Sequence, residues 1–125
     1  MKTLAALVLV LVGCGSDGSA PVVTDLVVGP LTVPVGTATA ITGTIRFTDS
    51  DGDVDQIAAA VTFAGARTEV GPANIQPSPG DVKEGSVAVG LSLSPPVAGT
   101  YELEVWLLDE SDNKSNKLTV SVTAQ

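Results

Sequence analysis

One stretch decides the fold: residues 99–107, with the sequence GTYELEVWL. Apolar side chains occupy every second position along it, which is the pattern of a β-strand that turns one face to a hydrophobic core and the other to solvent. The predicted inward set is Tyr101, Leu103, Val105 and Leu107, and the other face carries Glu102, Glu104 and Trp106. No long stretch of the chain shows apolar residues at helical spacing, so we expect an all-β protein.

The same period of two recurs on both sides of this stretch, in short runs separated by Gly, Pro, Asp and Asn. That spacing is typical of an antiparallel sandwich or barrel. The expected strands are 22–28, 38–47, 56–63, 67–70, 87–93, 101–107 and 118–122, with Ile45, Phe47, Ile57, Ala59, Val61, Phe63, Val87, Val89, Leu91 and Leu93 among the inward residues. Residues 31–33 are expected as a short edge segment that Pro34 ends. Residues 71–84 hold three prolines and two glycines, which predicts a long loop.

Composition limits what the protein can be. With 125 residues there is room for one domain, predicted at 22–125. The formal net charge of −8 argues against nucleic acid or an anionic membrane surface as an electrostatic partner. The chain has no His and a single Cys, and it lacks a nucleophile elbow and a phosphate-binding glycine loop. We therefore do not expect an enzyme.

The N-terminal segment reads as an export signal. Lys2 gives it a positive start, and residues 4–12 form an apolar run far shorter than the roughly 20 residues of a spanning helix. Leu11-Val12-Gly13-Cys14 resembles the lipobox of bacterial lipoproteins. The resemblance implies that residues 1–13 are removed, that Cys14 carries diacylglycerol and palmitate, and that 14–21 is a flexible tether. It places the protein on the membrane of a bacterial cell envelope, and in the outer membrane if the host has one, because Gly15 is not the inner-membrane signal Asp.

A second resemblance covers the domain as a pattern. Gly99-Thr100-Tyr101 enters an alternating strand, an acidic loop follows at 109–116, and a final Leu-x-Val-x-Val strand closes the chain. This is similar to the last two strands of bacterial immunoglobulin-like and fibronectin-III-like domains. The resemblance implies an antiparallel immunoglobulin-like β-sandwich of about seven strands, in which the Tyr101 hydroxyl bonds to nearby backbone.

The most unusual stretch is residues 49–55, DSDGDVD, with four carboxylates at alternate positions around one glycine. Closely spaced Asp with a turn-making Gly suits Ca²⁺, which takes six to eight oxygen ligands. The alternative is a solvated turn, since Asp and Gly favour turns in any case. In the resembling fold this loop shares one pole with loop 109–116. The candidate calcium ligands are Asp49, Asp51, Asp53 and Asp55, with Asp109 and Asp112 completing the shell.

Trp106 allows two interpretations. On the outward face it could stack on a sugar or anchor a partner, or it could pack under a neighbouring loop such as 71–84. The leading hypothesis is a binding or adhesion module that is displayed on a lipid anchor and recognises an unknown protein or glycan. The alternative is a structural subunit of an envelope assembly, joined to its neighbours by sheet-edge pairing.

Overall fold

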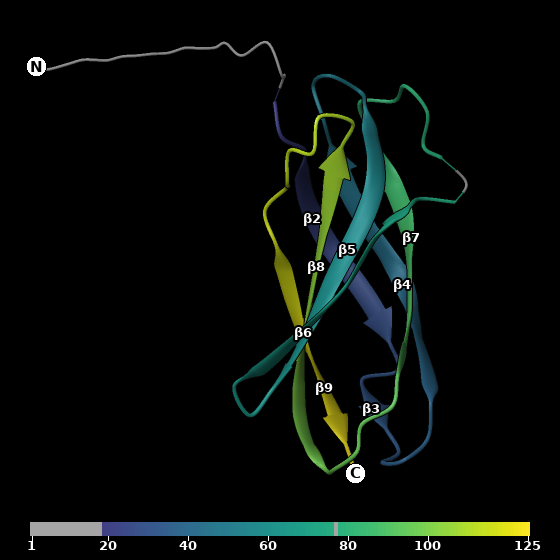
Figure 1. The fold of residues 1–125 in the computed structure, drawn as a ribbon. Coiled ribbons are helices and arrows are strands. Elements are labelled where there is room, and N and C mark those ends of the chain that lie inside the picture. Colours follow the sequence, from purple (N-terminus) through teal and green to yellow (C-terminus); the bar gives the residue numbers. More distant parts are fainter. Residues whose placement is uncertain (1–18, 77) are drawn as a thin grey trace, which may run out of the picture.

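The structure is a computed structural model that describes residues 19–76 and 78–125. Two β-sheets lie face to face, and the first described residues and the C-terminus lie at opposite ends of the sandwich (Figure 1). Cys14, the predicted signal peptide at 1–13 and most of the predicted tether lie outside the described residues. Within the described ranges, no helix is long and apolar enough to span a membrane.

The smaller sheet has three strands in the order β2-β4-β7, and the larger has five in the order β3-β9-β8-β5-β6. The smaller sheet consists of β2 (Val22–Gly29), β4 (Thr39–Thr48) and β7 (Glu84–Leu93). The larger consists of β3 (Thr32–Val33), β9 (Leu118–Ala124), β8 (Gly99–Asp109), β5 (Val54–Phe63) and β6 (Ala66–Asn74). The sheets confirm the predicted immunoglobulin-like sandwich.

Three details differ from the prediction. The described residues form eight strands, because the short segment at Thr32–Val33 is a strand of its own. It pairs parallel to β9, since the chain crosses from the smaller sheet to the larger one after β2. Strand β6 was predicted at 67–70 but continues to Asn74. Pro72 is tolerated there because β6 is an edge strand and its pairing with β5 shifts register at this point.

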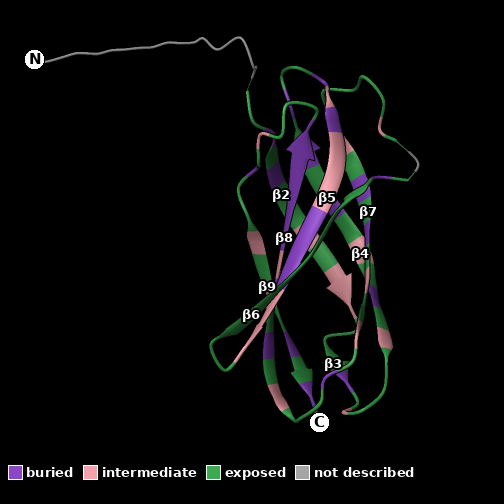
Figure 2. Cartoon of the chain, in the orientation of Figure 1, coloured by how far each residue is buried: buried purple, intermediate pink, exposed green. Residues whose placement is uncertain are grey.

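The core lies between the sheets and confirms the predicted inward faces (Figure 2). Val105 and Leu107 on β8 are fully buried, and Val87 and Val89 on β7 pack in the same cluster. The Tyr101 hydroxyl donates to the Val97 carbonyl at 2.8 Å, as the resemblance implied. The strands and core residues found in the described part of the chain all fall within residues 22–124, so a chain of residues 19–125 contains this hydrophobic core.

Candidate metal centre

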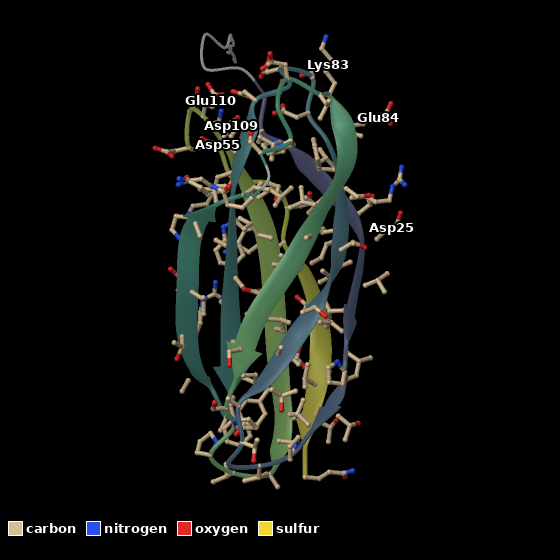
Figure 3. All side chains as sticks on the ribbon, turned by 90° about the vertical axis from the view of Figure 1, so that its right-hand side faces the viewer. Asp25, Asp55, Lys83, Glu84, Asp109 and Glu110 are labelled. Atoms are coloured by element: carbon tan, nitrogen blue, oxygen red, sulfur yellow. The ribbon has the colours of Figure 1, made fainter. Side chains whose placement is uncertain are left out.

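The two acidic loops meet at one end of the sandwich, where Asp55, Asp109 and Glu110 lie close together (Figure 3). The backbone N–H of Glu110 donates to the Asp53 carbonyl at 3.0 Å, which joins the β8–β9 loop directly to the β4–β5 loop. We call this end, formed by residues 49–55 and 109–113, the acidic pole. The predicted meeting of the two loops is confirmed.

Three aspartates converge within the pole. One carboxylate oxygen from each of Asp49, Asp53 and Asp109 lies within 4.8 Å of the other two. Two oxygens on opposite sides of a Ca²⁺ ion, each about 2.3–2.6 Å from it, are about 4.6–5.2 Å apart. A single ion can therefore contact all three residues. Asp49 is 2% exposed and Asp109 is fully buried, so solvent does little to relieve their mutual repulsion.

Backbone amides hold the two buried carboxylates in place. Asp49 accepts from the N–H groups of Asp51 at 3.3 Å and Asp53 at 3.2 Å. Asp109 accepts from the N–H groups of Ser111 and Asn113, both at 2.9 Å, and from the Asn113 side-chain amide at 3.0 Å. These donors orient the oxygens. Both backbone bonds to Asp109 fall on its Oδ1, so its Oδ2 is the oxygen that would face a cation.

Asp53 and Asp55 are the carboxylates whose charged form this arrangement disfavours. Each has one Oδ1 atom that is buried and has no hydrogen-bond partner. Burial, a hydrogen bond with Asp49 and the nearby charges of Asp109, Asp49 and Asp51 raise the pKa of Asp53 to about 6. Burial and the charges of Asp109 and Asp112 also raise the pKa of Asp55. A cation held by Asp49, Asp53 and Asp109 would offset the neighbouring negative charges that contribute to both shifts.

The remaining predicted ligands lie at the margin of the pole. Asp51 is exposed, and its Oδ2 accepts from the Ser19 N–H at 2.6 Å, which brings the chain preceding β2 to the acidic pole. Asp112 is exposed and occupies a turn with a positive φ of 63°. The structure thus brings Asp49, Asp53 and Asp109 together, places Asp55 beside them, and leaves Asp51 and Asp112 in solvent.

Local sequence explains how the loop closes. Gly52 has a φ of +66°, and a Cβ at this position would lie 2.9 Å from the Asp81 carbonyl oxygen. Only glycine fits that turn without displacing the neighbouring loop.

Asn113 orients Asp109 and was missed in the sequence, where nothing distinguishes it from other polar loop residues. The ion pairs found among the described residues involve Arg46 or Arg67, and none reaches the pole.

Trp106 is not a surface platform. Only 3% of the residue is exposed, and it packs with Ala58, Ala60 and Leu108 on the outer side of the larger sheet. Lys117 Nζ lies 4.6 Å from the ring centroid and Arg67 Cζ lies 5.8 Å from it, so these two side chains cover part of the Trp106 ring. Trp106 is therefore buried, but the side chains found over its ring are those of Lys117 and Arg67 and not the expected loop at 71–84.

Comparison with known proteins supports the fold. No family model and no curated protein matches the sequence. The PKD domain of an M14-like peptidase from Thermoplasmatales archaeon SCGC AB-540-F20 is similar with a TM-score of 0.51 at 24% identity, over 86% of this chain and 97% of that one. The fibronectin(III)-like modules of Clostridium thermocellum CbhA give 0.57 at 20% identity, over 93% and 50%. A Niemann-Pick type C2 protein from Japanese carpenter ant gives 0.55 at 15%, over 90% and 96%. At these identities the likeness is one of fold.

Proposed function

We propose that this chain is a lipid-anchored protein of a bacterial cell envelope whose immunoglobulin-like sandwich serves as a non-catalytic binding or adhesion module, stabilised by Ca²⁺ at the acidic pole. The observation that carries the calcium part is the convergence of Asp49, Asp53 and Asp109 carboxylate oxygens within 4.8 Å. Lipid anchoring rests on the lipobox at residues 11–14.

The position of the pole agrees with the proposed anchor. Strand β2 begins at this end, and the Ser19 N–H donates to Asp51. Only residues 15–18 would separate a lipidated Cys14 from Ser19, which is bonded to the pole, so the domain would lie close to the membrane. Acyl chains contribute about 0.8 kcal/mol per buried CH₂, so a Cys with two or three chains would hold the domain on the membrane almost irreversibly.

Calcium would act by relieving repulsion that folding creates. In the unfolded chain the two loops are apart, whereas in the folded domain Asp49 and Asp109 are buried near Asp53. An ion bound only by the folded state at 100 times its dissociation constant stabilises that state by about 2.7 kcal/mol. Modules outside cells typically bind Ca²⁺ with dissociation constants of about 10⁻⁴ to 10⁻³ M, so millimolar ion is the appropriate test.

Thermal unfolding of residues 19–125 tests the proposal. The melting temperature is measured in EDTA, in millimolar Ca²⁺, and in sodium chloride at matched ionic strength, since salt alone screens acidic loops. We expect Ca²⁺ to raise the melting temperature by several degrees beyond sodium. Equal melting temperatures in Ca²⁺ and sodium would mean that the β4–β5 loop is only a solvated turn.

A further inference from the structure

The two sheets do not match in width. The three-stranded sheet packs on the five-stranded sheet and is narrower than it. The inner face of the edge strand β6 is left uncovered. Cross-strand pairing places Val70 beside Ala59 and Ala73 beside Ile57, so these β6 residues share the inner face of β5. Yet all nine residues of β6 are exposed, as Figure 2 shows in green. The inner side of β6 thus carries small and apolar side chains, as in a strand that packs against a core, but these side chains are exposed.

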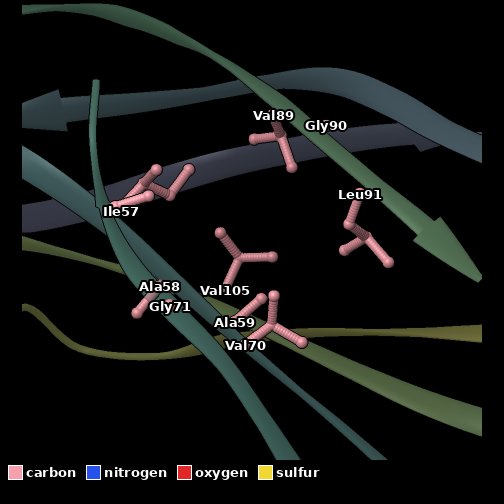
Figure 4. Close-up of a pocket in the computed structure, with 10 residues that line it drawn as sticks. Ile57, Ala58, Ala59, Val70, Gly71, Val89, Gly90, Leu91 and Val105 are labelled. Carbon is pink, nitrogen blue, oxygen red and sulfur yellow. The ribbon is translucent and has the colours of Figure 1, made fainter. Parts of the chain in front are cut away.

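An apolar cavity of about 130 Å³ opens at this place (Figure 4). Its lining includes Ile57 and Ala59 from β5, Val70 from β6, and Val89 and Leu91 from β7, and it contains no charged residue. The volume is close to that of an apolar protein cavity of ~150 Å³ that takes up benzene. The cavity can therefore accept one apolar side chain of ordinary size.

Strand β7 borders the cavity, and it is a long and regular edge strand of the smaller sheet. It pairs with β4 along ten residues without a register shift, and it contains no proline. By contrast, β2 is interrupted between Thr24 and Val27, and β3 has two residues. Ile75, Gln76, Ser78 and Pro79 line a small cavity together with Ser86–Ala88 of β7, so Val89–Leu93 is the part of the edge away from these residues. Among the described residues, no backbone hydrogen bond from a turn or loop reaches this part of the edge.

We propose that an extended segment of a partner protein pairs with the free edge of β7 at Val89–Leu93, as a fourth strand of the smaller sheet, and inserts an apolar side chain into the cavity. We call the edge and the cavity together the β7 groove. A peptide is favoured over a lipid because unpaired backbone N–H and C=O groups along the edge need hydrogen-bonding partners that hydrocarbon lacks. An uncharged inner face of the segment is favoured because a charge would be desolvated without a partner.

Charge also selects among partners. The chain has a net charge of −8, so a segment with basic residues at its ends is attracted to the domain. A second copy is a poorer fit, since antiparallel pairing of two β7 edges would place the two acidic poles, and the two proposed tethers, at opposite ends of the dimer. The inference rests on the proposed role as a binding module, and the preference for a partner over a second copy rests also on the proposed anchor. It is independent of calcium.

Binding of a labelled peptide to residues 19–125 tests the β7 groove. The probe is KTVTVTVTK, which alternates valine with threonine and has lysine at both ends, and the control peptide KVVVTTTTK has the same composition without alternation. Fluorescence anisotropy measures both. Val70→Lys places a charge at the groove, and Val27→Lys is its matched control, because Val27 is also an exposed edge valine but lies on β2. Ala73→Leu fills the cavity without adding charge.

We expect the alternating peptide to bind at least ten-fold tighter than the control peptide. Val70→Lys and Ala73→Leu should each weaken binding by about ten-fold or more, and Val27→Lys by less than about two-fold. No saturable binding up to about 1 mM peptide, or equal loss in Val70→Lys and Val27→Lys, would overturn the proposal. A dimer in sedimentation that Val70→Lys abolishes would assign the groove to a second copy instead. Calcium-dependent melting is measured separately, so a failure here leaves the metal proposal standing.

Discussion

Replacing Asp53 by asparagine should stabilise the ion-free domain and remove its response to Ca²⁺. The folded-state pKa of Asp53 is about 6 against an ordinary value of 3.8, so ionising this carboxyl at neutral pH opposes folding. That difference in pKa sets an upper limit of about 3 kcal/mol on the free energy of unfolding that the parent loses. Because solvent partly screens the charges, we expect a loss between about 1 and 3 kcal/mol. An asparagine amide keeps the shape and can donate to the neighbouring Asp49 carboxylate.

The assay is thermal unfolding of residues 19–125 at pH 7.5. In EDTA, Asp53→Asn should melt roughly 4 to 12 °C above the parent, at about 4 °C per kcal/mol for a domain of this size. In millimolar Ca²⁺ the parent should gain stability and the variant should not. Asp25→Asn is the matched control, since Asp25 is an exposed residue of β2 whose Oδ2 lies 3.8 Å from Arg46 Nε, and it should change stability by less than about 0.5 kcal/mol. A variant that is no more stable than the parent in EDTA, or that keeps the full Ca²⁺ response, would refute the reasoning.

Four further outcomes follow from the same structure. In EDTA the stability advantage of Asp53→Asn should grow as pH rises from about 4 to above 6, because the raised pKa makes the parent lose stability through that window; a constant difference in melting temperature would contradict it. Leu103→Ala should cost about 2 to 5 kcal/mol in denaturant unfolding while Glu102→Ala costs less than about 0.5, and equal effects would reverse the assigned faces of β8. Gly52→Ala should cost more than about 1 kcal/mol and weaken the Ca²⁺ response, because a Cβ there meets the neighbouring loop. Cys14→Ser should accumulate as an unprocessed precursor on immunoblots of membranes, and normal processing would exclude lipidation.

Most of the fold could be predicted from the sequence, because apolar and polar residues alternate clearly wherever one face of a strand is buried. The inward residues of β8 and the return of the Tyr101 hydroxyl to the backbone were predicted from alternation and from the resemblance, and both are confirmed. Strand β6 was underestimated since Gly71 and Pro72 indicate a loop in sequence, whereas an edge strand accommodates them at a register shift.

The position of the acidic pole could be predicted from the sequence, but the aspartates that converge there could not. Loop topology brought residues 49–55 to residues 109–112, yet alternation within the loop could not show which carboxylates turn inward. Backbone amides select Asp49 and Asp109, and Asp51 is held by the Ser19 N–H instead. Those choices depend on turn geometry at Gly52 and Asn113, which single-residue preferences do not specify. The burial of Trp106 likewise depends on Lys117 and Arg67, which come from other elements.

The start of β2 also determines how the domain bears mechanical load. The Asn116 side chain accepts from the Val23 N–H at 2.8 Å and donates to the Val23 carbonyl at 3.0 Å, which ties the first strand to the loop before the last strand. A pull on the N-terminal segment reaches Val23 and passes through Asn116 into the larger sheet as well as through the β2–β4 ladder into the smaller one. Tension at the N-terminus is therefore shared between both layers, and peeling of the first strand requires both attachments to break.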